Sequence, residues 1–227
     1  MALYDGNGNV LSTNSGSLAT NAKVCAIGDS NTQYMGSNLE TNVKKYVGIQ
    51  SLKNFGTAGA TWEVREGEDA SVTTNTSAVG KVNQLIANAN VDTDMCTDYD
   101  VITIMMGTNC LVVGDKTNTS SDVGTMCGAI RYCLEKLLYY YRKSRIGVII
   151  PPQRAEINVE QNQKNELIRE LCQEYSIPIL DFYYEGQVVP DSTTPNGSSY
   201  YLSDGTHLGG NGQEQFYRKY SAFINRL

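Results

Sequence analysis

Short runs of apolar residues alternate along the chain with longer segments in which apolar residues recur every three or four positions. Most of the short runs are almost continuously apolar and several are rich in β-branched residues, which is typical of strands buried on both faces, whereas residues 51–55 give a weaker strand pattern. The predicted strands are residues 24–28, 51–55, 101–106, 146–150 and 177–182. The helical spacing predicts helices over about 36–46, 82–89, 126–141, 167–175 and 212–224.

This alternation predicts a parallel sheet, because parallel strands need crossover connections that place helices on the faces of the sheet. We therefore expect an α/β fold over residues 23–227, a three-layer α/β/α sandwich with a central parallel sheet of about five strands. In such sheets ligands bind beyond the carboxyl ends of the strands. Candidate chemistry should lie in the loops that follow the strands.

Residues 1–22 have a different character. Two short apolar segments flank a Gly/Asn turn, which predicts a hairpin followed by a polar connector. The spacing Asp5-x-Asn7-x-Asn9 offers calcium binding as an alternative, but Val10 stands where a calcium loop needs glycine. We expect the hairpin, and no bound metal.

Composition restricts the classes of partner. Apolar residues make up 41% of the chain and charged residues 19%, as in ordinary globular proteins. The net charge of −6 argues against nucleic-acid binding, which needs clustered Lys and Arg. The chain lacks the roughly 20 consecutive apolar residues of a membrane span, and no signal peptide is visible at its beginning. A cytoplasmic location is the default expectation, with export or assembly into a surface or tail structure left open. The oligomeric state is left open as well.

The six cysteines form no CxxC pair. Most stand at apolar positions of predicted elements, where a thiol behaves as a small hydrophobe. Cys96 and Cys110 are expected in loops and are available to pair. One histidine and scattered thiols do not make a four-ligand zinc set, so we expect neither a metal nor another cofactor.

Four motifs carry the candidate chemistry. Gly28-Asp29-Ser30 follows the first predicted strand, and residues 54–61, which include Gly59, follow the second. Asn109 ends the Gly-Thr-Asn sequence after the third strand, and the only histidine stands in Asp204-Gly-Thr-His207 before the last helix. A serine hydroxyl needs a neighbouring base to become a nucleophile, and histidine is the side chain suited to that role near neutral pH.

These motifs, in this order, resemble those of the SGNH hydrolases, also called GDSL-type esterases and lipases. The resemblance extends from Val24 to about Phe216 and implies a flavodoxin-like fold. It implies that Ser30 is the nucleophile, His207 the general base and Asp204 the residue that orients the imidazole. It also implies an oxyanion hole built from the Ser30 N–H, the Gly59 N–H and the Asn109 amide.

The chain departs from the family pattern at two motifs. The first reads Gly-Asp-Ser-Asn-Thr instead of Gly-Asp-Ser-Leu, and Cys110 follows Asn109 where the family usually has Asp. Loss of that Asp removes a possible hydrogen bond of the third loop. As a rival nucleophile Cys110 would lack a second base. The Gly-x-Ser-x-Gly elbow and the nucleotide-binding glycine motifs are absent, which argues against other serine hydrolases and against nucleotide binding.

The resemblance and the polar, tyrosine-rich loops favour a serine esterase acting on short acyl groups, most of all on acetyl groups of carbohydrates. The loops expected to line the site are residues 61–77 and 183–203, and the expected substrate contacts are Asp29, Asn31, Trp62 and Tyr201. Two alternatives stay open. One is a lipase, lysophospholipase or thioesterase for longer acyl chains, and the other is a non-catalytic glycan-binding module of a larger assembly.

Overall fold

The computed structural model describes residues 18–69, 71, 76–92, 95–154, 159–188 and 200–227. The predicted hairpin and its calcium alternative lie outside the described residues. Residues 18–22 pack on the domain, where Ala19 and Ala22 are buried and the Asn21 N–H donates to the Gly48 carbonyl.

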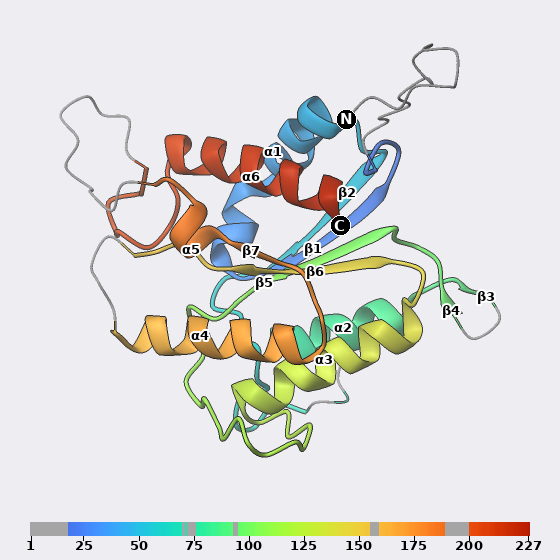
Figure 1. Cartoon of the computed structure of the whole chain (residues 1–227), viewed down its shortest axis with the longest axis vertical. Helices are drawn as coiled ribbons and strands as arrows, with labels where there is room; N and C mark the ends of the chain where they lie inside the picture. The colour runs from blue at the N-terminus through green and yellow to red at the C-terminus, as the bar shows by residue number, and fades with distance from the viewer. Residues whose placement is uncertain (1–17, 70, 72–75, 93–94, 155–158, 189–199) are drawn as a thin grey trace, which may run out of the picture.

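A five-stranded parallel sheet forms the centre of the domain, in the order β2-β1-β5-β6-β7. The strands are β1 (Lys23–Gly28), β2 (Ser51–Gly56), β5 (Val101–Met105), β6 (Arg145–Ile150) and β7 (Ile179–Asp181). The helices are α1 (Ser30–Val47), α2 (Ala78–Ala87), α3 (Met126–Tyr140), α4 (Val159–Glu174), α5 (Phe182–Glu185) and α6 (Gly210–Arg226). Helices α1, α5 and α6 cover one face of the sheet, and α2, α3 and α4 cover the other (Figure 1). The predicted α/β/α sandwich is confirmed.

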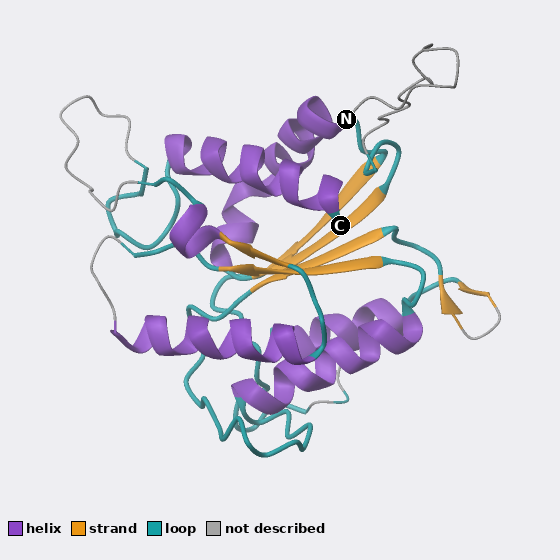
Figure 2. Ribbon diagram, viewed as in Figure 1, coloured by secondary structure: helices purple, strands orange, loops and turns teal. Residues whose placement is uncertain are grey.

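The sheet lies between two layers of helices (Figure 2). Successive strand residues point to opposite faces, so the sheet separates two apolar cores. Cys25 and Ile27 of β1 join the core beneath α2, α3 and α4. Val24 and Ala26 join the core beneath α1 and α6. Because both faces are covered, strands β1, β5 and β6 read as nearly continuous apolar runs, whereas the edge strand β2 is only partly buried and gives a weaker pattern.

Several elements differ from the prediction. Helix α4 begins at Val159 instead of near 167, and helix α2 begins at Ala78 instead of near 82. Helix α1 begins at Ser30 instead of near Gly36, and Gly36 interrupts it with a φ of 49° and a ψ of −136°. Strand β7 is shorter than predicted because Asp181 caps helix α5, which takes Phe182 out of the strand. The antiparallel pair β3 (Val91–Asp92) and β4 (Met95–Cys96) was not predicted, since two residues a strand leave no readable pattern.

All six cysteines are free and buried. Cys96 and Cys110, which the sequence left available to pair, are therefore not joined by a disulfide. Burial raises the pKa of the Cys110 thiol well above its usual value. A thiol held protonated in this way is a poor nucleophile.

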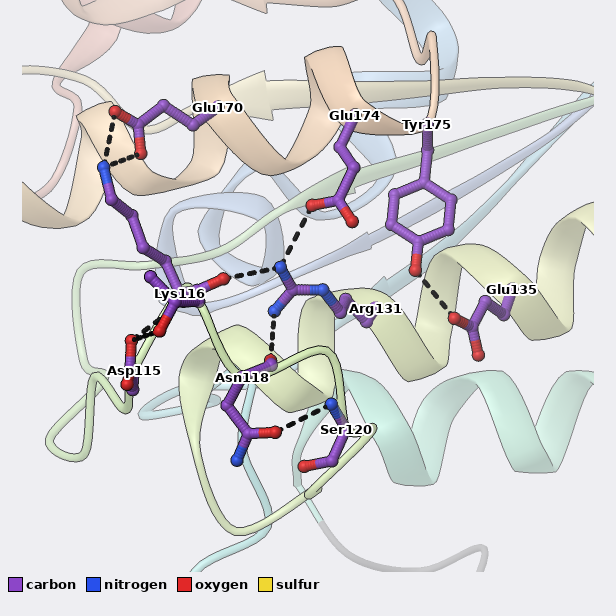
Figure 3. Close-up of polar contacts among 10 residues, drawn as sticks. Asp115, Lys116, Asn118, Ser120, Arg131, Glu135, Glu170, Glu174 and Tyr175 are labelled. Carbon is purple, nitrogen blue, oxygen red and sulfur yellow. Dashed lines mark hydrogen bonds and ion pairs between the residues drawn. The ribbon is translucent and has the colours of Figure 1, made fainter.

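One buried arginine fastens the long loop between β5 and α3 (Figure 3). The Arg131 guanidinium donates to the carbonyls of Asn118 and Lys116 at 3.0 and 2.8 Å and pairs with Glu174 of α4 at 3.0 Å. Its side chain is 3% exposed. The loop between β5 and α3, which contains Asn109, is thereby fixed to both α3 and α4.

Candidate active site

Ser30 lies at the turn between β1 and α1. Strand and helix approach closely there, since a Cβ on Gly28 would lie 1.9 Å from the Thr32 hydroxyl oxygen. The Asp29 carboxylate caps the helix by accepting the Asn31 N–H at 3.0 Å. Ser30 is thus the first residue of α1, at the positive end of the helix dipole.

The sheet brings three loops to one edge. Gly28 at the end of β1 is paired with Gly56 of β2 on one side and with Met105 of β5 on the other. The loops that follow these strands therefore lie next to one another. The side-chain amide of Asn109 in the third loop donates to the Ala60 carbonyl in the second at 3.1 Å.

His207 connects Ser30 and Asp204. Its Nε2 lies 2.7 Å from the Ser30 Oγ, and its Nδ1 lies 2.7 Å from Asp204 Oδ2. The other oxygen of Asp204 accepts the backbone N–H groups of Thr206 and His207 at 2.9 and 3.0 Å. The sequence-predicted triad residues are thus brought together, although 177 positions separate Ser30 from His207.

Electrostatics decide the direction of these hydrogen bonds. Desolvation raises the pKa of Asp204. The hydrogen bonds from the His207 ring and from the backbone N–H groups of His207 and Thr206 outweigh this effect and lower the pKa to about 2. An ionised carboxylate only accepts hydrogen bonds, so Nδ1 carries the imidazole proton. Nε2 is left to accept from the Ser30 hydroxyl.

A short closed loop carries Asp204 and His207. The Leu202 N–H donates to the His207 carbonyl at 2.8 Å, and Tyr201 and Leu208 form an antiparallel bridge at the base of the loop. Gly205 within it has a φ of 63°, in the left-handed region that favours glycine. The spacing Asp-Gly-Thr-His is therefore the spacing of a tight turn.

The two loops next to the Ser30 turn carry two further candidate groups, Gly59 and Asn109. Gly59 has a φ of 72°, and its carbonyl accepts a hydrogen bond from the Arg65 guanidinium at 2.5 Å. Asn109 lies beside this segment through its contact with Ala60. The backbone N–H of Gly59 and the amide of Asn109 are hydrogen-bond donors of the kind that stabilise an oxyanion.

The third loop is held without the Asp that the family pattern places after Asn109. Cys110 is buried, and its sulfur accepts the Trp62 N–H at 3.3 Å. The following amide, of Leu111, donates to Glu63 Oε1 at 2.7 Å. Glu63 is 2% exposed. A buried carboxylate from the second loop thus binds the backbone of the third, and sequence reasoning missed it.

The four expected substrate contacts are buried. Trp62 is 0% exposed and donates its indole N–H to the Met106 carbonyl at 3.0 Å, so it belongs to the core. Tyr201 is also 0% exposed, and its hydroxyl donates to the Gln153 carbonyl. For both residues the prediction of substrate contact was wrong, because the large apolar ring was needed for packing.

Asn31 and Asp29 serve the local structure. Asn31 accepts the Leu208 N–H at 3.0 Å and donates to the Thr206 carbonyl at 3.4 Å, which positions the His207 loop. Asp29 is 1% exposed, and its Oδ2 has no hydrogen-bond partner. Burial raises the pKa of Asp29 to about 6. Neither side chain is accessible for substrate contact, which corrects both predictions.

Tyr34 is an exposed aromatic residue beside the triad that sequence reasoning missed. Its ring centroid lies 4.6 Å from that of His207, and the side chain is 52% exposed. Tyr34 lies four residues after Ser30, so both project from one face of α1. The i,i+4 spacing would have revealed it if the helix start had been recognised.

Within the described part of the chain, no group of three or more His, Cys, Asp or Glu residues is arranged to hold a metal ion. Over the same residues, no helix combines the length and the apolar character that a membrane span needs.

Comparison with known proteins agrees with this geometry. A family model described as the GDSL-like Lipase/Acylhydrolase family matches residues 26–215. No curated protein sequence matches the chain.

Solved structures resemble the whole domain. A protein from Lactobacillus plantarum is 18% identical with a TM-score of 0.68, over 91% of this chain and 98% of that one. A possible lipase from Chitinophaga pinensis is 14% identical with a TM-score of 0.61, over 90% and 98%. A lipase/acylhydrolase from Enterococcus faecalis is 16% identical with a TM-score of 0.59, over 90% and 95%. At these identities the likeness shows a common fold.

Proposed function

Because the chain belongs to the GDSL-like lipase/acylhydrolase family, we propose that it is a serine esterase whose nucleophile is Ser30. The observation that carries the proposal is the continuous hydrogen-bonded series from Ser30 through His207 to Asp204, with both contacts of His207 at 2.7 Å. In this arrangement His207 accepts the hydroxyl proton while the oxygen of Ser30 attacks an ester carbonyl.

The remaining steps use the same groups. The negative oxygen of the tetrahedral intermediate accepts hydrogen bonds from the Ser30 and Gly59 N–H groups and the Asn109 amide. The imidazolium of His207, stabilised by ionised Asp204, then gives its proton to the departing alcohol. Water then attacks the acyl-enzyme while His207 accepts a proton from it. His207 returns this proton to the Ser30 oxygen, which frees the serine and releases the carboxylic acid.

For the substrate we propose a short acyl group, most of all an acetyl group on a carbohydrate. The position of Tyr34 favours a sugar as the leaving alcohol, because Tyr34 lies beside the imidazole that protonates this alcohol. An exposed tyrosine offers both an apolar face and a polar hydroxyl, which suits a ring that is itself amphipathic.

A specific observation favours the longer-chain alternative. A cavity of about 580 Å³ lies along the second and third loops, and four aliphatic side chains contribute to its lining, Val64, Leu111, Val112 and Val123. Leu111 and Val112 are neighbours in the chain and are 76% and 53% exposed, so this part of the lining presents adjoining apolar side chains to solvent. Such a cavity would suit an acyl chain.

The test compares wild type with Ser30→Ala on p-nitrophenyl acetate, butyrate and octanoate and on an acetylated glycan. We expect Ser30→Ala to lower kcat by about 10⁴ or more with unchanged folding, and wild type to prefer acetate. Preference for octanoate would move the assignment to a lipase, and equal activity of the two proteins would reject Ser30 as nucleophile.

A fluorophosphonate probe separates the enzyme from a glycan-binding module. We expect an adduct on Ser30 of the wild type that is absent from Ser30→Ala. Folded wild-type protein that binds a glycan without labelling would support the binding module.

A further inference from the structure

A second cavity, of about 350 Å³, opens beside Asn109 and is lined by cations from three separate segments. These are Arg65 from the second loop, Arg154 after β6 and Lys164 of α4. Among its described lining residues Glu160 is the one carboxylate. The described lining thus carries an excess of positive charge, although the net charge of the chain is −6.

Two of the cations are tied to the loops of the oxyanion donors. Arg65 donates to the Gly59 carbonyl at 2.5 Å, and Arg154 donates to the Thr108 carbonyl at 3.4 Å. The Arg154 Nε is buried and has no hydrogen-bond partner. Both guanidinium groups thus retain donors beyond the contact that positions them, because arginine carries five N–H groups.

The third cation is buried with an exposed partner. The side chain of Lys164 is 6% exposed, whereas that of Glu160, 2.5 Å away, is 66% exposed. Lys164 and Glu160 belong to the first turns of α4, whose dipole adds positive potential at this end. The exposed carboxylate of Glu160 therefore pairs with the Lys164 ammonium from the solvent side. A carboxylate of a ligand can compete with Glu160 for this ion pair.

The position of the cavity relates it to the reaction. It shares Asn109 with the proposed oxyanion hole, and Arg65 contacts the Gly59 carbonyl. When the carbonyl oxygen of an ester faces these donors, either its alcohol part or its acyl part lies close to the cavity. Arginine and lysine form strong, charge-assisted hydrogen bonds with carboxylates.

We propose that this cavity binds a carboxylate of the substrate, so that the preferred substrate is an ester that itself carries a negative charge. This inference rests on the proposed esterase function and narrows its substrate class. The carboxylate belongs either to the alcohol, as in an O-acetylated uronic acid, or to the acyl group, as in a dicarboxylic monoester.

Binding to the Ser30→Ala protein tests the inference without requiring turnover. Methyl β-glucuronoside and methyl β-glucoside differ by a carboxylate in place of a hydroxymethyl group, and monomethyl succinate and methyl butyrate form the acyl-side pair. We expect calorimetry to show that the anionic member of one pair binds about tenfold tighter or more. The advantage should shrink as salt is raised. The pair that shows it identifies which part of the substrate carries the charge.

Further substitutions in the Ser30→Ala background should change the preference for the anionic ligand in opposite directions. Arg154→Gln and Lys164→Met should each reduce the anionic preference, and Glu160→Gln should increase it by removing the competing carboxylate. Arg154→Gln and Glu160→Gln keep the result informative if Lys164→Met fails to fold. Lys143→Gln is the matched control, because Lys143 is exposed at the opposite edge of the sheet, just before β6.

Equal binding within both pairs would overturn the inference, and so would a preference that all three cavity variants leave unchanged. Ester hydrolysis is scored separately on wild type. Ser30-dependent hydrolysis without anionic preference rejects the inference alone, whereas anionic binding without hydrolysis supports the cavity and rejects the esterase.

Discussion

The side-chain amide of Asn31 holds the backbone on both sides of His207. It accepts the Leu208 N–H at 3.0 Å and donates to the Thr206 carbonyl at 3.4 Å. The residue directly after the proposed nucleophile thereby positions the proposed base, which arrives from the other end of the chain.

Asn31→Ala should therefore lower kcat with little change in KM. A small displacement of a catalytic group costs on the order of 10²-fold in rate, and the Leu208 N–H left without a partner should cost about 1–3 kcal/mol of stability. Steady-state kinetics and urea unfolding measure the two effects. Asn38→Ala is the control, because Asn38 is exposed on the same helix. Unchanged kcat in Asn31→Ala would show that Asn31 does not position His207.

Asn109→Ala should lower kcat by about 10²–10³ if its amide stabilises the oxyanion. KM should change little, because the interaction forms chiefly in the transition state. Comparing kcat and KM for p-nitrophenyl acetate tests this, with circular dichroism to verify the fold. A rise in KM at constant kcat would assign Asn109 to substrate binding instead.

Asp29 should make the protein less stable as the pH rises from about 4 to about 6. Burial raises the pKa of its carboxyl from the usual 3.8 to about 6. Between these values the folded state binds more protons than the unfolded state, so the free energy of unfolding decreases with pH. The difference corresponds to about 3 kcal/mol above pH 6.

Asp29→Asn removes this ionisation and keeps a good N-cap. The variant should unfold at higher urea concentrations than wild type above pH 6, and the advantage should vanish below pH 4. An advantage that is constant from pH 4 to pH 7 would contradict a raised pKa at Asp29.

Arg131→Met should destabilise the domain by about 2–3 kcal/mol, because it removes charge-assisted hydrogen bonds from a buried side chain. Lys116→Met is the matched control from the same network (Figure 3). Its ion pair with Glu170 is half exposed on both sides, and such pairs contribute at most about 1 kcal/mol. Similar urea midpoints for the two variants would show that Arg131 does not fasten the loop.

The sheet was predictable from local signals, whereas the triad was assigned through the resemblance of its motifs to those of the SGNH hydrolases. Strands β1, β5 and β6 are nearly continuous apolar runs, whereas Ser30, Asp204 and the single histidine were recognised by the order of the family motifs that contain them. The start of α1 was missed because Ser30, Asn31 and Thr32 are polar yet buried, so the first turn shows no apolar period.

Side-chain environments were harder to predict. Trp62 and Tyr201 were expected at the substrate and lie in the core, since an aromatic residue in a loop gives no sign of the direction in which it points. The pairing of Glu63 with the backbone after Cys110 joins residues 48 positions apart. No local pattern records such a contact.

The separation of Ser30 from His207 along the chain makes the proposed hydrolysis a reporter of long-range folding. Ser30 begins α1, whereas His207 precedes α6, and the two helices lie together on one face of the sheet (Figure 1). A chain still emerging from the ribosome holds the serine long before it holds the base. On the proposed mechanism, ester cleavage starts only after the loop that carries His207 has docked against the start of α1, so the appearance of activity during refolding would time that step.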